Sequence, residues 1–314
     1  MEAQHLAGHG SKRIPVILDT DIGGDIDDTW ALAFLLRSQE LDLRLVVTET
    51  GNTTYRAKVA AKMLEAAGRT DVPIGVGLHL GEETDRQSAW VEDYDLADYP
   101  GGICHDGVKT LIKTIMDSPE LVTLVCIGPV PNIAAALERE PRIAEGARFV
   151  GMHGCLRKSP LEYGGGGGIV KEYNVAADPK ACQKVFTAPW DMVITPLDTC
   201  GFVRLAGEKY RVVRGFDDPL AQALMENYGI WLRAGHGDWR REFESRSSIL
   251  FDTVAVYLAF SEELLVMEKL GVRVTDDGYT VIDDEAKTIN CATEWKDLSA
   301  FQNLLVERLT GIRI

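Results

Sequence analysis

The sequence predicts an open α/β fold, in which a mainly parallel, Rossmann-like sheet is flanked by helices and carries a helical cap. Three observations predict it. Short apolar runs alternate with helical patterns along most of the chain, a helical stretch rich in aromatic residues follows them, and no segment has the composition of an interdomain linker. We therefore expect a single domain over residues 14–314, preceded by a flexible tail over residues 1–13.

The alternation of strands and helices is regular. Apolar runs typical of strands buried on both faces occupy residues 14–19, 43–48, 72–76, 121–127, 148–152 and 191–196. Helical patterns occupy residues 30–36, 55–67, 108–116, 132–139 and 179–186. This order favours a parallel sheet with right-handed crossovers, in which ligands collect beyond the carboxyl ends of the strands. Asp19, Asn52 and Ile127 each fall at such an end.

Two later segments are expected to cover the sheet. Residues 207–260 are mostly helical in pattern and have an aromatic-rich middle, which predicts the cap. The five consecutive glycines at 164–168 are the only low-complexity tract and predict a mobile loop, of the kind that serves as a plain connector or as an active-site lid.

Composition narrows the classes of partner. A net charge of −15 argues against nucleic acid or an anionic membrane as the main partner. No stretch approaches the roughly 18–20 apolar residues that cross a bilayer, and the first residues lack the apolar core of a signal peptide. Six cysteines without a C-x-x-C pair indicate reduced thiols. These features predict a cytoplasmic protein with a small-molecule substrate.

An aspartate cluster at the end of the first strand is the strongest functional signal. Five carboxylates lie between residues 19 and 28, beside glycines and without a Lys or Arg. Buried without partners, they would repel one another and be costly to desolvate. A hard cation such as Ca²⁺ or Mg²⁺ is the simplest compensation, whereas a solvated acidic turn would not explain the buried strand before it and the apolar helix after it.

Two other aspartate motifs are alternative explanations of this cluster. A calcium-binding EF-hand loop starting at Asp19 would need a bidentate Glu at its twelfth position, where this chain has Trp30, so that interpretation fails. A phosphatase of the haloacid dehalogenase type also places D-x-D after its first strand. It normally has Thr or Val two residues after the second Asp, where this chain has Gly23, so this alternative is weakened but stays open.

The segment DTDIGGDIDDTWAL at residues 19–32 resembles the N-terminal signature of the nucleoside hydrolase family, D-x-D-x-G-x-D-D-x-x-A-L, with two extra residues before the final Asp pair. Further similar segments follow in the same order. They are residues 48–52, ending in Gly-Asn; IGPVPNIA at 127–134, with Pro131 where the family has Thr; EYN at 172–174, followed by Asp178 and Pro179; and a late Asp252. The resemblance covers roughly residues 14–260.

This resemblance implies the nucleoside hydrolase fold and a Ca²⁺-dependent cleavage of the N-glycosidic bond of ribonucleosides, with one Ca²⁺ per chain. It implies that the metal is held by Asp21, Asp28, Asp252 and the backbone carbonyl of Ile127. Asp21 would also act as general base on a metal-bound water. Ribose hydroxyls would be bound by Asp27, Asn52, Glu172 and Asn174. Family members are commonly dimers or tetramers, so a homo-oligomer is expected by resemblance.

The late Asp also stands out without the resemblance. Asp252 lies in the apolar run ILFDTVAV at residues 249–256, where an unpaired carboxylate would be unfavourable unless a metal or a donor met it. The alternative explanation is that its side chain caps the start of a helix.

Three departures from the family pattern bear on the substrate. Phe251 stands where one branch of the family has a His that helps protonate the leaving base, and Gly166 stands where an Asn often contacts ribose. Asp25 and the two-residue insertion have no clear counterpart. Base contacts are predicted for Trp231, His236, Trp239 and Phe251, since aromatic rings can stack on a base and His can act as an acid. A catalytically silent ribose- and metal-binding homologue is the main alternative.

Overall fold

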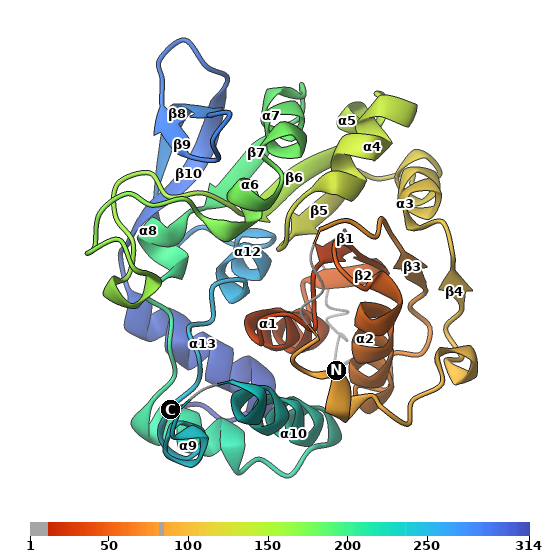
Figure 1. Cartoon of the computed structure of the whole chain (residues 1–314), viewed down its shortest axis with the longest axis vertical. Coiled ribbons are helices and arrows are strands. Elements are labelled where there is room, and N and C mark those ends of the chain that lie inside the picture. Colours follow the sequence, from red (N-terminus) through yellow and green to blue (C-terminus); the bar gives the residue numbers. More distant parts are fainter. Residues whose placement is uncertain (1–11, 82–84, 236) are drawn as a thin grey trace, which may run out of the picture.

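The computed structural model describes residues 12–81, 85–235 and 237–314. Its centre is one ten-stranded sheet with the order β4-β3-β2-β1-β5-β6-β7-β10-β8-β9 (Figure 1). The strands are β1 (Ile14–Thr20), β2 (Leu41–Thr48), β3 (Ile74–Val76), β4 (Ile103–Cys104), β5 (Val122–Cys126), β6 (Ala147–Met152), β7 (Met192–Thr195), β8 (Leu265–Val274), β9 (Thr280–Ile282) and β10 (Thr288–Trp295). The seven strands from β4 to β7 in this order are parallel, and β10 also pairs parallel with β7. The predicted open, mainly parallel α/β fold is confirmed.

Helices cover both faces of this sheet because the strands bury side chains alternately on each side. Along β1, Val16 and Leu18 belong to one apolar core and Ile17 belongs to the other. The helices are α1 (Asp27–Arg37), α2 (Thr53–Ala66), α3 (Gly107–Met116), α4 (Pro131–Arg139), α5 (Ile143–Gly146), α6 (Tyr173–Ala177), α7 (Pro179–Thr187), α8 (Leu197–Cys200), α9 (Gly207–Arg214), α10 (Pro219–Ala234), α11 (Trp239–Ser245), α12 (Thr253–Leu258) and α13 (Leu298–Thr310). Side chains from α1, α2, α12 and α13 form the first core, and those from α3, α4 and α7 form the second.

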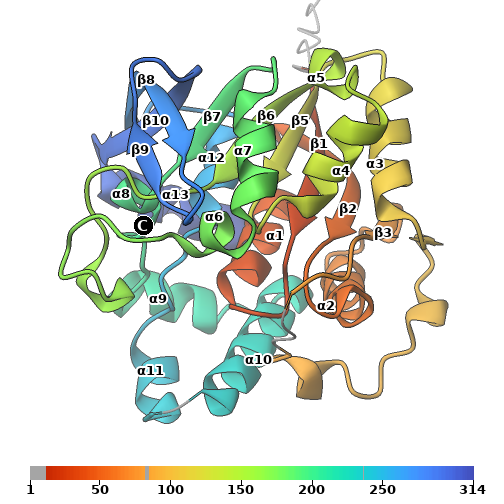
Figure 2. The same cartoon turned by 45° about the horizontal axis from the view of Figure 1, so that its top comes forward.

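The predicted cap divides into two parts. Helices α9, α10 and α11 lie together beyond the sheet, at the bottom of the view in Figure 2. In contrast, α12 is a core helix whose residues from Thr253 to Leu258 are all buried. A cap over residues 207–245 therefore replaces the predicted span of 207–260.

The edge formed by β8, β9 and β10 was not predicted from sequence. The three strands are joined by antiparallel pairing between β8 and β10 and between β8 and β9. Half of the residues of β8 are half-buried and two more are exposed, and a Glu and a Lys lie within the strand. A half-exposed edge strand lacks the continuous apolar run that marks the central strands.

Two further expectations concern the ends of the chain and membranes. The predicted tail at residues 1–13 lies almost entirely outside the described residues. Within the ranges that are described, no helix is both long and apolar enough to span a bilayer.

A buried histidine lies directly after β6. The His153 ring is fully buried and packs against the rings of Phe149 and Phe186. Burial lowers the pKa of His153 from 6.5 to about 3. Because the unfolded chain binds this proton below about pH 6.5 and the folded chain does not, the stability tied to neutral His153 is present above that pH and is lost as the pH falls toward 3.

We therefore predict that His153→Phe removes this loss. As the pH falls from about 7 to about 5, wild type should lose about 2 kcal/mol of its free energy of unfolding relative to the variant, measured by denaturant titration. His105→Phe, at an exposed position, is the control and should follow wild type. An unchanged difference between wild type and His153→Phe at the two pH values would contradict the prediction.

Candidate active site

The candidate site lies where the carboxyl ends of four adjacent strands meet. In the strand order, β2, β1, β5 and β6 are neighbours, so the residues that follow them share one edge of the sheet. The register pairs Asp19 with Cys126 of β5 and Thr20 with Thr48 of β2. Asp21 and Ile127 therefore leave the sheet side by side, at the edge to which the strand-end argument assigned Asp19 and Ile127.

A cavity of about 320 Å³ opens at this edge. Its wall is strongly acidic, with five aspartates and one glutamate. The lining residues are Asp21, Gly24, Asp25, Asp27, Asp28, Arg86, Ile127, Met152, Tyr163, Glu172, Tyr173, Asn174, Phe251 and Asp252. In the part of the chain that the structure describes, Arg86 is the one basic residue in this wall.

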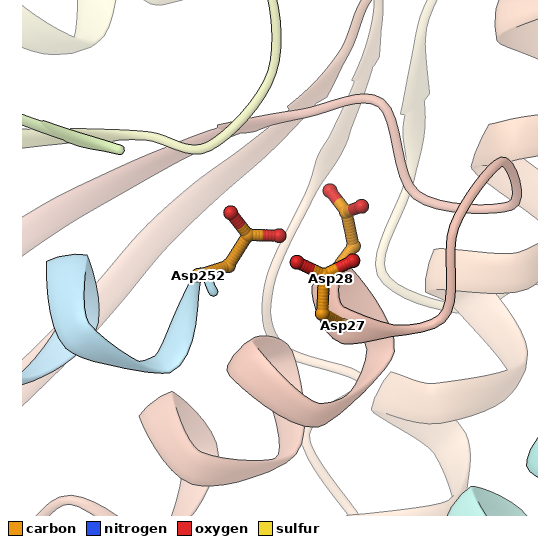
Figure 3. A group of neighbouring side chains, drawn as sticks. All are labelled: Asp27, Asp28 and Asp252. Atoms are coloured by element: carbon orange, nitrogen blue, oxygen red, sulfur yellow. The ribbon is translucent and has the colours of Figure 1, made fainter. Parts of the chain in front are cut away.

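Three of these carboxylates converge. One oxygen each from Asp27, Asp28 and Asp252 lies within 4.8 Å of the other two, and all three residues are buried (Figure 3). Asp27 and Asp28 form the first turn of α1, and Asp252 directly precedes α12. The side chain of Asp252 makes no capping hydrogen bond to α12 within the described residues. The capping explanation for this residue therefore fails, and the convergence with the α1 carboxylates takes its place.

The electrostatics of this group are unfavourable for the protein alone. Burial and the negative charges of Asp21 and Asp27 raise the pKa of Asp28 well above its usual range. Burial, followed by the charges of Asp27 and Asp28, raises the pKa of Asp252 in the same way. The Thr20 hydroxyl donates to Asp28 at 2.5 Å, which offsets only part of this cost. An oxygen-rich, buried and mutually repelling set of this kind fits a hard divalent cation.

Asp21 and Ile127 line the same cavity beside this group. Burial raises the pKa of Asp21, while the positive charge of Arg56 opposes that shift. The Ile127 carbonyl, one of the predicted metal ligands, accepts a hydrogen bond from the Asn174 amide at 3.3 Å. The resemblance implies that Asp21 binds the metal and that Asp27 binds ribose. In the structure, Asp27 belongs to the tight carboxylate group and Asp21 does not.

The loop that carries the aspartates is held by its backbone. Each carbonyl from residue 22 to residue 25 accepts a hydrogen bond from a side chain of another element. The donors are Arg56 to Ile22 at 3.0 Å, Tyr55 to Gly23 at 3.0 Å, Trp231 to Gly24 at 3.2 Å and Gln87 to Asp25 at 2.8 Å. The inserted residues, which had no counterpart in the family pattern, therefore lie in a fixed loop.

The predicted ribose-binding residues differ in their position. Glu172 and Asn174 line the cavity, and the Glu172 carboxylate accepts backbone N–H bonds from Gly154, Asn174 and Val175. Burial raises the pKa of Glu172 to about 7 despite these bonds. Asn52 instead caps α2 by accepting from Tyr55 N at 3.0 Å, and it is not among the described lining residues. Its contact with ribose stays a prediction.

The residues predicted to contact the base lie at different places relative to the cavity. Phe251 lines the main cavity and also a side cavity of about 290 Å³, which Trp231 borders with one face stacked on Tyr228. Trp239 lies against the guanidinium groups of Arg233 and Arg240 and lines neither of these two cavities. His236 lies outside the described residues. Gly166, where the family often has Asn, is exposed and absent from the described lining.

Several residues of the site were missed by sequence reasoning. Glu49 directly follows β2 and is fully buried, and neither of its carboxylate oxygens has a partner in the described ranges. Burial, Asp21 and Asp19 raise the pKa of Glu49 well above its usual range. The strand-end rule applied to β2 would have found it. Arg86 and Tyr163 lie in loops, where no pattern in the sequence singles them out.

In open α/β proteins, ligands and substrates bind beyond the carboxyl ends of the strands, which is where this carboxylate pocket lies. Comparison with known proteins is more specific. The profile of the inosine-uridine preferring nucleoside hydrolases matches residues 16–304. A probable uridine nucleosidase of Arabidopsis thaliana is 27% identical over 91% of this chain and 90% of its own length. A non-specific ribonucleoside hydrolase of Klebsiella pneumoniae is 28% identical over 88% and 90%.

A solved structure agrees with these relatives. A plant nucleoside hydrolase superposes with a TM-score of 0.78 at 25% identity, covering 96% of this chain and 100% of that chain. The chain therefore belongs to the family of inosine-uridine preferring nucleoside hydrolases, and it is a hydrolase of N-glycosyl bonds. A phosphatase of the haloacid dehalogenase type does not fit, because Asp19, its nucleophile, would be fully buried, and no Lys lines the cavity in the described ranges.

The close approach of Gly128 to two carboxylates gives a test of this geometry. A Cβ added at Gly128 would lie 2.1 Å from Glu49 Oε1 and 2.8 Å from Asp21 Oδ1. Gly128→Ala should therefore displace Asp21 and lower the rate of N-glycosyl hydrolysis by about 100-fold. The control is Gly168→Ala, whose Cβ would come no closer than 3.5 Å to another atom and should leave the rate unchanged. Equal activity of the two variants would contradict the assigned geometry.

Proposed function

We propose that the protein hydrolyses the N-glycosidic bond of ribonucleosides to ribose and free base, using one Ca²⁺ per chain and no covalent intermediate. The single observation that carries the proposal is the convergence of Asp27, Asp28 and Asp252 within 4.8 Å in a buried pocket. Membership of the nucleoside hydrolase family supports the substrate class.

The residues present fit the cation. Asp27, Asp28 and Asp252 supply oxygen ligands, which Ca²⁺ prefers, and the Asp21 carboxylate and the Ile127 carbonyl line the same cavity. When bound, Ca²⁺ would neutralise part of the carboxylate charge, orient ribose hydroxyls and make a nearby water easier to deprotonate. The bound cation would also offset the burial and the mutual repulsion that together raise the pKa values of Asp28 and Asp252.

The protein side chains perform the remaining steps. Asp21, which lines the cavity beside the carboxylate group, takes a proton from the attacking water as that water adds to the ribose C1′. As the bond to the base lengthens, positive charge develops on the ribose ring. The surrounding carboxylates stabilise this charge because they are buried and already oriented. Glu172 and Asn174, which line the same cavity, would bind ribose hydroxyls.

One observation favours a second candidate, a binding protein without turnover. Phe251 lines the cavity beside Asp252 and carries no proton that it can give to a leaving base. In that case ribose or a nucleoside would bind at the acidic floor but would not be cleaved.

A cytoplasmic location and a homodimer or homotetramer remain parts of the proposal.

The test is release of free ribose from a panel of purine and pyrimidine nucleosides, with and without a Ca²⁺ chelator. Wild type should release ribose only when Ca²⁺ is present. Asp21→Asn should lower kcat by about 100- to 10,000-fold, because the general base is lost while the shape of the site is kept. Asp93→Asn, at an exposed position, is the control.

Two other outcomes have distinct meanings. Turnover that is unaffected by the chelator would overturn the Ca²⁺ requirement. If Ca²⁺-loaded, folded protein binds nucleosides but releases no ribose from any of them, the binding function replaces the hydrolytic one.

A further inference from the structure

The departing base needs a proton. When the N-glycosidic bond breaks, its electron pair goes to a nitrogen of the base, and an unprotonated base leaves as an unfavourable anion. The identity of the group that gives this proton rests on the proposed function and concerns the wall of the same cavity. If ribose occupies the carboxylate floor, the base must lie against the remaining wall, which contains Arg86, Tyr163, Tyr173 and Phe251.

Few groups in this wall can donate a proton. A guanidinium group does not act as a general acid in proteins, which excludes Arg86. The Asn174 amide already donates to the carbonyls of Ile127 and Met152, at 3.3 and 3.0 Å. Phe251 has no acidic proton. Apart from the carboxyl groups, which the proposed function assigns to the cation, the water and the ribose, the hydroxyls of Tyr163 and Tyr173 are the neutral donors that remain in the described lining.

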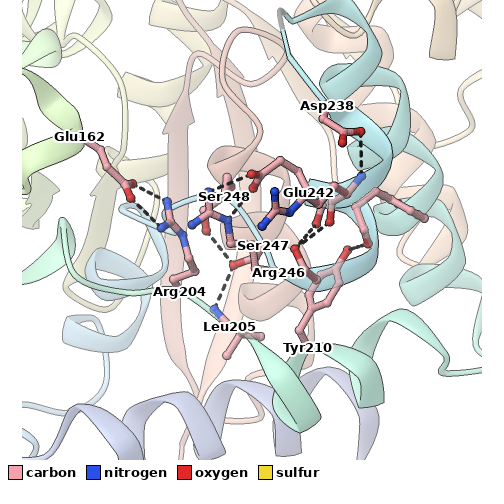
Figure 4. A network of polar contacts seen from close by, with 12 residues as sticks. Glu162, Arg204, Leu205, Tyr210, Asp238, Glu242, Arg246, Ser247 and Ser248 are labelled. Atoms are coloured by element: carbon pink, nitrogen blue, oxygen red, sulfur yellow. Dashed lines mark hydrogen bonds and ion pairs between the residues drawn. The ribbon is translucent and has the colours of Figure 1, made fainter.

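Tyr163 is the better placed of the two, because three contacts fix it. Its Oη accepts a hydrogen bond from the backbone N–H of Tyr173 at 2.9 Å, and its ring packs edge-on against Phe251 with centroids 6.0 Å apart. The preceding residue, Glu162, pairs through both oxygens with Arg204, at 3.1 and 2.6 Å (Figure 4). In contrast, Tyr173 is 52% exposed.

The hydroxyl proton of Tyr163 is unused. Its oxygen accepts from Tyr173, but no acceptor for its own proton is found in the described ranges. A half-buried phenol with a free proton, held at the edge of an acidic cavity, is available to a ligand in that cavity.

We propose that Tyr163 is the acid that protonates the leaving base. As water adds to C1′ and gives its proton to Asp21, the C1′–N bond breaks and its electron pair takes the proton of Tyr163 Oη. Asp21 then releases its proton to solvent, and the Tyr163 phenolate takes one back. The products are ribose and the neutral base, so one water is consumed and no proton is gained or lost.

The surroundings of the phenol suit this role. Burial raises the pKa of Tyr163, so the phenol is neutral and holds its proton before the reaction, although the same shift makes it a weaker acid. The N–H bond from Tyr173 stabilises the oxygen once that proton has left. The ring contact with Phe251 places the Tyr163 ring beside the residue that borders both cavities.

The test compares leaving groups that differ in their need for a proton. Inosine and uridine need protonation of the base, whereas p-nitrophenyl β-D-ribofuranoside releases a stable phenolate without it. Tyr163→Phe should lower kcat on the two nucleosides by about 100-fold and change kcat on the nitrophenyl riboside by less than about threefold. The control, Tyr279→Phe, removes a hydroxyl from a tyrosine outside the described lining and should match wild type on all three substrates.

The other outcomes overturn the proposal in recognisable ways. An equal fall on all three substrates would show that Tyr163 only shapes the site. Nucleoside hydrolysis within about threefold of wild type would show that another group is the acid. If wild type cleaves none of the three substrates, the proposed function itself fails, and the role of Tyr163 fails with it.

Discussion

Mutual repulsion among buried carboxylates is the constraint on which the site depends. Asp27, Asp28 and Asp252 are between 2% and 4% exposed and their oxygens approach one another, while the charge of Arg56 offsets only a small part of the cost at Asp28. The desolvation of one such group is costly, and three together are tolerated only when another positive charge or bound protons compensate. The start of α1 contributes a favourable dipole at Asp27 and Asp28, but that contribution is small by comparison.

The rest of the fold keeps these groups together. The adjacent carboxyl ends of β1 and β5 fix where the aspartate loop begins, and α1 and α12 fix where its partners lie. The carbonyls at 22–25 are tied to α2, to the segment at Gln87 and to α10. Because those donors come from separate elements, the loop cannot relax to separate its charges without breaking contacts to the cap. Such preorganisation is what an electrostatic catalyst requires.

Much of the site could be predicted because its residues follow strand ends. The buried strand before Asp19 and the apolar helix after Asp28 placed the aspartates at the correct edge, and the apolar run around Asp252 marked a carboxylate that needed a partner. The central strands were found for the same reason, since strands buried on both faces give continuous apolar runs.

Other features could not be predicted, for physical reasons. The β8–β10 edge is half-exposed, so its sequence lacks that continuous apolar signal. Tyr163 and Arg86 reach the cavity from loops, whose paths are set by tertiary contacts such as the Glu162–Arg204 pair rather than by local periodicity. Asn52 was grouped with the site by its position after a strand, but its side chain caps α2. The predicted contact of Trp231 with the base stays a prediction, and the hydrogen bond from its indole N–H to the aspartate loop was not foreseen.

The most direct test of the central claim is a count of bound Ca²⁺ with a parallel measurement of unfolding. Wild type should hold one Ca²⁺ per chain and be stabilised by about 3 kcal/mol when free Ca²⁺ exceeds the dissociation constant a hundredfold. Asp252→Asn, which keeps the shape of the side chain, should remain folded and lose both effects. Folded wild-type protein that retains no cation and is not stabilised by Ca²⁺, Mg²⁺ or Mn²⁺ would contradict the account.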